Sequence, residues 1–158
     1  LHVEVDEVEP VAGSGPVDRL LRRTRSDTPP VTVVFVHGFC LNLDCWHFQR
    51  AAYRGLVRTV YYDQRSHGRS GRSDRAHATI DQLGRDLHRV LEEVVPDGPV
   101  VLVGHSMGGM SIVAFAEQFP ELIGTRVVGI GLISTTAGGL DPSRMLLPML
   151  PEIGRAHV

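Results

Sequence analysis

The sequence predicts an α/β fold, in which helices flank a mostly parallel sheet, and two observations carry this prediction. Short apolar runs rich in β-branched residues alternate along the chain with segments of helical periodicity, as in parallel sheets. The run at residues 31–36 is apolar at almost every position, which is typical of a strand buried on both faces of such a sheet.

The other elements are expected in the same alternating order. Thr79 and Gln82 form a capping-box pattern, and Pro96 follows a segment with one apolar stripe, so residues 80–94 predict the clearest helix. Further helices are expected at residues 46–53 and 107–119, and further strands at residues 1–5, 57–62, 100–103 and 127–133.

Composition and charge exclude several classes of protein. Of 158 residues, 42% are hydrophobic and 22% charged, and the net charge is −2, so neither a disordered chain nor a nucleic-acid partner is expected. The apolar runs are shorter than the roughly 20 residues of a membrane span, so we expect none. Cys40 and Cys45 are too few for a disulfide framework. We therefore expect a cytoplasmic protein with no metal and no cofactor.

The most informative motif is Gly-His-Ser-Met-Gly at residues 104–108, between an expected strand and an expected helix. A serine on so tight a turn takes a strained backbone, and only small residues two positions away leave room for it. Gly104 and Gly108 meet this requirement, and Gly109 is expected to let the helix approach the sheet. The pattern predicts that the Ser106 hydroxyl is held at the carboxyl edge of the sheet, at the positive end of a helix.

A loop that binds a phosphate or a dinucleotide also joins a strand to a helix, and it is the alternative for this segment. Such a loop requires Gly-x-Gly-x-x-Gly, or a Walker pattern with a lysine. Neither pattern occurs, and the chain contains no lysine at all.

A second motif, His37-Gly38-Phe39, follows the buried strand at residues 31–36. An oxyanion needs two N–H donors close to the point where its charge develops. The candidates are the backbone N–H groups of Phe39 and of Met107, the residue after the serine. A simple turn remains the alternative for His37 and Gly38.

Three motifs together resemble the amino-terminal half of the α/β-hydrolase-fold superfamily: residues 37–39, 63–70 and 104–109. The resemblance covers residues 31–136 and implies a sheet truncated after about the sixth strand. It implies Ser106 as the nucleophile and Phe39 with Met107 as the oxyanion hole. These residue types look most like the serine esterase, lactonase and cofactor-free haloperoxidase branches. Ser66 departs from the family, which usually has glycine there.

The two ends predict that the chain is part of a longer protein. Alternation at residues 1–5 is typical of a strand already under way. We expect residues 1–139 to be the amino-terminal part of the hydrolase core and residues 140–151 to begin a cap or lid. Residues 152–158 resemble a translated sequencing adapter, which predicts non-native read-through, and a native polar tail is the alternative.

A serine nucleophile needs a histidine and an acid, which follow it in this fold in the order acid, then histidine. The candidates after Ser106 are Glu117, Glu121, Asp141, Glu152 and His157. Glu117 and Glu121 are expected to face solvent, and His157 lies in the suspected read-through. Asp63 precedes the serine and is expected to brace its own turn. We therefore expect the triad acid and histidine to lie outside this chain.

These observations predict a serine hydrolase that cleaves a carboxylic ester or related acyl compound through an acyl-enzyme, with a small acyl molecule as its partner. The chain by itself is expected to be inactive. A cofactor-free peroxidase or acyltransferase on the same triad is one alternative, and a non-catalytic binding protein is another. The oligomeric state is left open.

Overall fold

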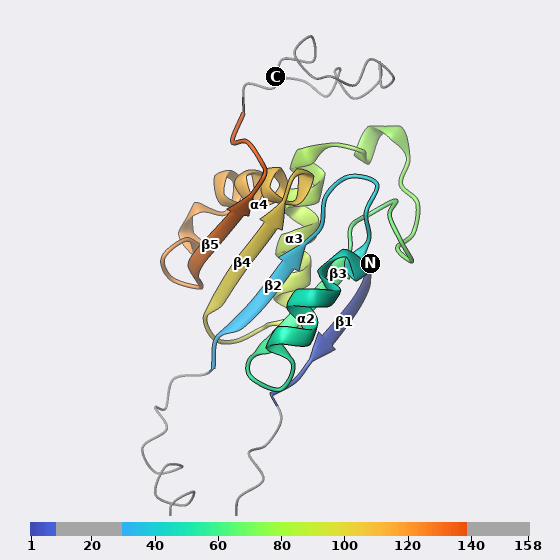
Figure 1. Ribbon diagram of the computed structural model, residues 1–158. Coiled ribbons are helices and arrows are strands. Elements are labelled where there is room, and N and C mark those ends of the chain that lie inside the picture. The colour runs from blue at the N-terminus through green and yellow to red at the C-terminus, as the bar shows by residue number, and fades with distance from the viewer. Residues whose placement is uncertain (9–29, 139–158) are drawn as a thin grey trace, which may run out of the picture.

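The computed structural model describes residues 1–8 and 30–138 and contains a five-stranded sheet with helices on both faces (Figure 1). The strands are β1 (His2–Asp6), β2 (Thr32–Val36), β3 (Arg58–Asp63), β4 (Val100–His105) and β5 (Val127–Ile133). Their order is β1-β3-β2-β4-β5, in which β1 runs antiparallel to β3 and the other pairs are parallel. The predicted α/β class with a mostly parallel sheet is confirmed, and the five described strands lie where strands were expected.

The helices form one layer on each face of the sheet. On one face lie the short helix η1 (Leu43–Trp46) and α2 (His47–Tyr53), and on the other lie α3 (Ile80–Val94) and α4 (Met107–Gln118) (Figure 1). Two single turns, η2 (Arg75–His77) and η3 (Pro120–Leu122), complete the helical elements of the described residues.

Both faces of the central strand β2 are buried, as its apolar run predicts. Val34 packs with α3 and α4 in the larger core, while Phe35 packs with Trp46 and Tyr61 in the smaller one. The rings of Phe35 and Tyr61 are stacked with their centroids 5.0 Å apart. Such aromatic pairs contribute beyond the area they bury.

Helix α3 begins at the predicted cap. The Thr79 hydroxyl oxygen accepts a hydrogen bond from the Gln82 N–H at 3.2 Å. The Gln82 side chain donates to the Asp86 carboxylate at 3.1 Å, so only one half of the expected capping box forms. Gly84 permits close packing on α4, because a Cβ there would lie 2.8 Å from the backbone nitrogen of Phe115.

The sheet topology defines where a site can form. β2 and β4 are neighbours, yet the chain leaves β2 toward α2 on one face and leaves β4 toward α4 on the other. In α/β sheets, ligands bind at the carboxyl ends of strands at such a switch point. The expected cap at residues 140–151 and the suspected read-through at residues 152–158 lie outside the described residues.

Candidate active site

Ser106 lies at the turn between β4 and α4, at the carboxyl edge of the sheet beside the switch point. Its φ is 51° and its ψ is −118°, a conformation that residues other than glycine rarely adopt. The side chain is half-buried and does not cap α4, although it stands at the amino end of that helix. The hydroxyl is therefore available at a position where the helix dipole favours negative charge.

The glycines around Ser106 are explained by backbone contacts. A Cβ on Gly104 would lie 2.7 Å from the carbonyl oxygen of Gly108, and a Cβ on Gly108 would lie 2.6 Å from the carbonyl carbon of Val36. A Cβ on Gly109 would instead meet the side chain of Thr135, 2.5 Å from its Oγ1. Gly109 thus makes room for Thr135 in the segment after β5.

The first loop, residues 37–42 after β2, lies directly against the serine turn. A Cβ added to Gly38 would lie 3.3 Å from the Cβ of Ser106 and 2.9 Å from Nδ1 of His105. Phe39 follows with 44% of its surface exposed. The two motifs, about 70 residues apart in the sequence, are therefore neighbours in space.

Two backbone donors lie near this contact. Within the described residues, the N–H groups of Phe39 and Met107 donate to no protein acceptor. Met107 is the first residue of α4, where an N–H has no partner inside the helix. Within the described residues, both predicted donors are thus available for an oxygen of a bound molecule.

His37 is fully buried and both of its ring nitrogens are used. Nδ1 lies 2.8 Å from the carbonyl oxygen of Gly38, and Nε2 accepts from the backbone N–H of Gln64 at 3.0 Å. These partners require the neutral ring with the proton on Nδ1. Burial lowers the pKa of His37 below its usual 6.5. The residue shapes the loop and has no free nitrogen with which to accept a proton from Ser106.

Gln64 and Ser111 support this loop and were not found in the sequence. The Gln64 side-chain amide donates to the carbonyl oxygen of His37, and the buried Ser111 hydroxyl lies 2.9 Å from the Gln64 side-chain oxygen. A chain of polar contacts therefore joins the ends of β2 and β3 to α4. The only available signal was a serine within the apolar face of the helix at residues 107–118.

Asp63 braces the loop after β3, as the sequence led us to expect. Its carboxylate accepts from the backbone N–H of Leu43 at 2.8 Å and from that of Arg69 at 2.7 Å. A Cβ on Gly68 would lie 2.6 Å from Oδ1 of Asp63, so glycine is required at that position. Because its carboxylate is fully engaged here, Asp63 is part of the scaffold.

Ser66, which replaces the family's usual glycine, adopts a φ of 63°. That left-handed conformation explains the preference for glycine at this position. The Ser66 hydroxyl accepts from the N–H of Ser73 at 2.9 Å, which helps to hold the turn. The loop therefore forms despite the substitution.

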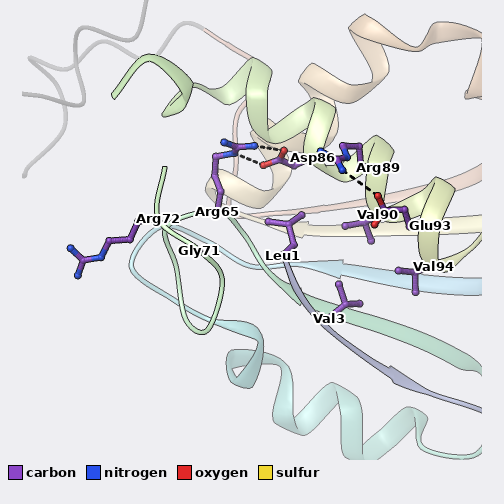
Figure 2. A pocket seen from close by; sticks show the side chains of 10 residues that line it. All are labelled: Leu1, Val3, Arg65, Gly71, Arg72, Asp86, Arg89, Val90, Glu93 and Val94. Carbon is purple, nitrogen blue, oxygen red and sulfur yellow. Dashed lines mark hydrogen bonds and ion pairs between the residues drawn. The ribbon is translucent and has the colours of Figure 1, made fainter. Parts of the chain in front are cut away.

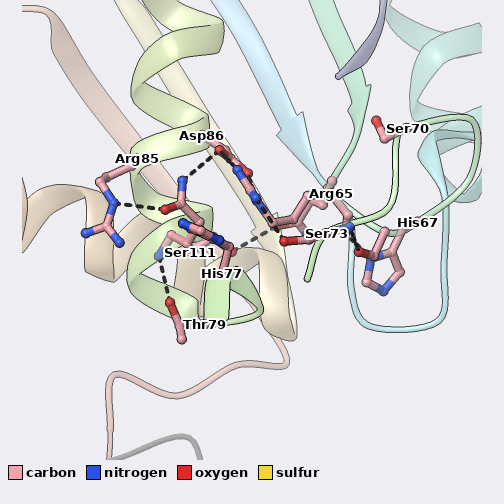
Figure 3. A network of polar contacts seen from close by, with 12 residues as sticks. Arg65, His67, Ser70, Ser73, His77, Thr79, Arg85, Asp86 and Ser111 are labelled. Carbon is pink, nitrogen blue, oxygen red and sulfur yellow. Dashed lines mark hydrogen bonds and ion pairs between the residues drawn. The ribbon is translucent and has the colours of Figure 1, made fainter. Parts of the chain in front are cut away.

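An ion pair fastens the same loop to α3 (Figure 3). The guanidinium of Arg65 donates two hydrogen bonds to Asp86, whose side chain is 4% exposed, and one to the hydroxyl of Ser73 at 3.1 Å. The hydrogen bonds to Asp86 raise the pKa of Arg65. A bidentate ion pair of this kind fixes the orientation of the guanidinium as well as its position.

The acidic residues after the serine do not complete a triad within the described part of the chain. Glu117 and Glu121 are exposed, as expected. His67 lies near the first loop, but its Nδ1 is 2.9 Å from the carbonyl oxygen of Arg65. The remaining candidates, Asp141, Glu152 and His157, lie outside the described residues.

A pocket of about 250 Å³ lies elsewhere, between β1, α3 and the loop after β3 (Figure 2). Arg65 pairs with Asp86 in its wall, and Arg89 pairs with Glu93 at 3.3 Å. Neither Ser106 nor the first loop lines it. The pocket therefore contributes nothing to the predicted site.

The two cysteines differ in environment. Cys40 is exposed, whereas Cys45 is half-buried. Burial raises the pKa of Cys45 to about 11. Among the described residues, no three His, Cys, Asp or Glu side chains cluster as metal ligands, and no helix is long and apolar enough to cross a membrane.

The fold and this strand–turn–helix site define a member of the α/β class with a serine at the switch point. Residues 33–157 match the alpha/beta hydrolase family, and the chain belongs to that family.

Similar proteins agree with this assignment. The chain is 33% identical to Epoxide hydrolase 1 of Caenorhabditis elegans over 64% of this chain and 25% of that protein. It is 32% identical to Methylesterase 8 of Arabidopsis thaliana over 60% of this chain and 35% of that protein. A solved esterase from Thermogutta terrifontis superposes with a TM-score of 0.68 at 25% identity, covering 90% of this chain and 43% of the esterase. The chain thus spans a quarter to a third of the length of these two relatives.

Proposed function

We propose that the complete protein is a serine hydrolase that cleaves a carboxylic ester or a related acyl compound. The observation that carries this proposal is the strained Ser106, held at the amino end of α4 with its Cβ against the first loop. Relatives named methylesterase and esterase support the substrate class.

In the proposed reaction, the Ser106 hydroxyl oxygen attacks the acyl carbonyl carbon while a base removes the hydroxyl proton. The carbonyl oxygen becomes an oxyanion and accepts hydrogen bonds from the N–H groups of Phe39 and Met107. Preorganised donors of this kind supply much of the rate enhancement, and losing one costs about 10²- to 10³-fold in rate. The alcohol then leaves with a proton, and water releases the acid from the acyl-enzyme.

The base and the acid that orients it belong, in this proposal, to parts of the protein outside the described residues. Both nitrogens of His37 are engaged, and Asp63 braces its own turn. We therefore propose that the 158-residue chain by itself is inactive. Val128, Ile130 and Leu132 are 42–53% exposed on the edge strand β5, so we also expect it to aggregate.

Three other functions stay open for the complete protein. A cofactor-free peroxidase or an acyltransferase would use the same Ser106, and a binding protein would keep the site without a base. The chain is also similar to an epoxide hydrolase, but the residue at the nucleophile position argues against that activity. Opening an epoxide through an enzyme ester needs a carboxylate there, and this chain has a serine.

A fluorophosphonate probe on the complete protein tests the proposal. We expect one labelled serine, with labelling lost in Ser106→Ala. Ser66→Ala is the matched control, because Ser66 also has a positive φ but lies in a different loop, and labelling should persist. Absence of label at Ser106 would refute the proposed serine hydrolase activity. Assays with peroxide or an alcohol acceptor then separate hydrolysis from the two related activities.

A further inference from the structure

The strained turn at Ser106 is held from both sides, by the last residue of β5 and by the segment that follows it. The Ser106 N–H donates to the carbonyl oxygen of Ile133 at 2.9 Å, and the Thr135 hydroxyl donates to the carbonyl oxygen of Ser106 at 2.6 Å. Between the two partners, Ser134 has a φ of 47°, which turns the chain back toward the serine. Strained conformations persist only where surrounding contacts over-determine them, and these two contacts do so.

Thr135 is also closely packed on the first turn of α4. A Cβ on Gly109 would lie 2.5 Å from both Oγ1 and Cγ2 of Thr135, so the glycine leaves the space that this side chain fills. The Gly109 N–H donates to the same carbonyl oxygen of Ser106 at 2.9 Å. The Met110 N–H donates to it as well, at 3.3 Å, so the Ser106 carbonyl has two donors from the helix and one from the loop after β5.

The direction of this carbonyl matters because of the peptide bond that contains it. The carbonyl of Ser106 and the N–H of Met107 belong to one planar peptide unit and point in opposite directions. A donor that fixes the carbonyl also fixes the direction of the Met107 N–H. That N–H is one of the two proposed oxyanion donors.

We propose that Thr135 is a positioning residue, which aims the Met107 N–H at the oxyanion by holding the Ser106 carbonyl. This inference rests on the proposed function of Ser106. Thr135 touches no reacting atom in this role, so it acts on the transition state more than on substrate binding. Its loss should lower kcat and leave KM nearly unchanged.

Kinetics of the complete protein with a p-nitrophenyl ester test the proposal. Thr135→Val keeps the shape and removes the hydroxyl, and we expect kcat to fall about tenfold, less than the loss of a whole donor. Thr135→Ser keeps the hydroxyl and should recover most of kcat. Thr136→Val, the same change at the next residue, is the matched control and should change neither constant. An unchanged kcat in Thr135→Val, or a change confined to KM, would overturn the proposal.

A second measurement does not depend on activity. In Thr135→Val, amide hydrogen exchange at Gly109 and Met110, whose N–H groups also donate to the Ser106 carbonyl, should become about tenfold faster. Exchange at Leu87 in α3 should stay unchanged. If the parent protein has no esterase activity, the proposed function is wrong. If amide exchange at Gly109 is unchanged in Thr135→Val, the positioning role is wrong, whatever the activity. Should the valine variant not fold, Thr135→Ala carries both measurements.

Discussion

An added methyl group at Gly108 tests the packing of the serine turn directly. The Cβ of alanine there would lie 2.6 Å from the carbonyl carbon of Val36 and 2.7 Å from the carbonyl oxygen of His37. Real Cβ atoms essentially never come within 3.0 Å of such neighbours. Because the neighbours are backbone atoms at the end of a buried strand, no side-chain rotation relieves the overlap.

Two effects of opposite sign act on this substitution. Alanine is favoured over glycine inside a helix by about 1 kcal/mol. Overpacking against a rigid neighbour costs about 3 kcal/mol, the upper part of the usual range, because α4 must move away from β2. We therefore expect Gly108→Ala to lower the free energy of unfolding by about 2 kcal/mol.

Urea unfolding of the complete protein, followed by circular dichroism, measures this change. Gly71→Ala is the matched control, because a Cβ at Gly71 meets no atom within 4 Å and the φ of Gly71 is not positive. That variant should be unchanged or more stable by up to about 1 kcal/mol. If Gly108→Ala is as stable as the parent, the steric explanation of the motif is wrong.

Three further outcomes are expected. Asp86→Ala should lower the free energy of unfolding by about 2 kcal/mol, since it leaves the guanidinium of Arg65 without its buried partner; urea unfolding tests this, and no change would contradict it. Burial lowers the pKa of His37, so the unfolded state binds more protons below pH 6.5, and stability should fall as pH decreases through that value. The free energy of unfolding, measured from pH 7 to 5, should depend less steeply on pH in His37→Asn. An equally steep dependence would refute this role of His37. A thiol reagent at pH 8 should modify exposed Cys40 before Cys45, whose pKa burial raises to about 11; mass spectrometry after Cys40→Ser checks the order.

Local patterns in the sequence were enough to predict the elements around the site. The β-branched run of β2 and the cap at Thr79 placed a buried strand and a helix, and both formed there. The motif at residues 104–108 placed a serine on a turn between strand and helix because its glycines answer a steric need. These features depend on neighbours a few residues away, which a sequence displays.

The contacts that hold the site are of another kind. His37 meets Gln64 across 27 residues, Ser111 meets Gln64 across 47, and Thr135 meets Ser106 across 29. None of these pairs has a local pattern that a sequence could reveal. Which polar atoms become neighbours depends on the strand order and on the register of β2, β4 and β5.

The sequence by itself therefore determined the α/β class, the position of Ser106 on its turn and the glycines that permit that turn. It did so because periodicity and steric room are properties of short segments. Only the tertiary structure decided that Gly38 lies against Ser106 and that Thr135 holds the Ser106 carbonyl. Those contacts arise when separate strands align at one edge of the sheet, and packing of the whole fold sets that alignment.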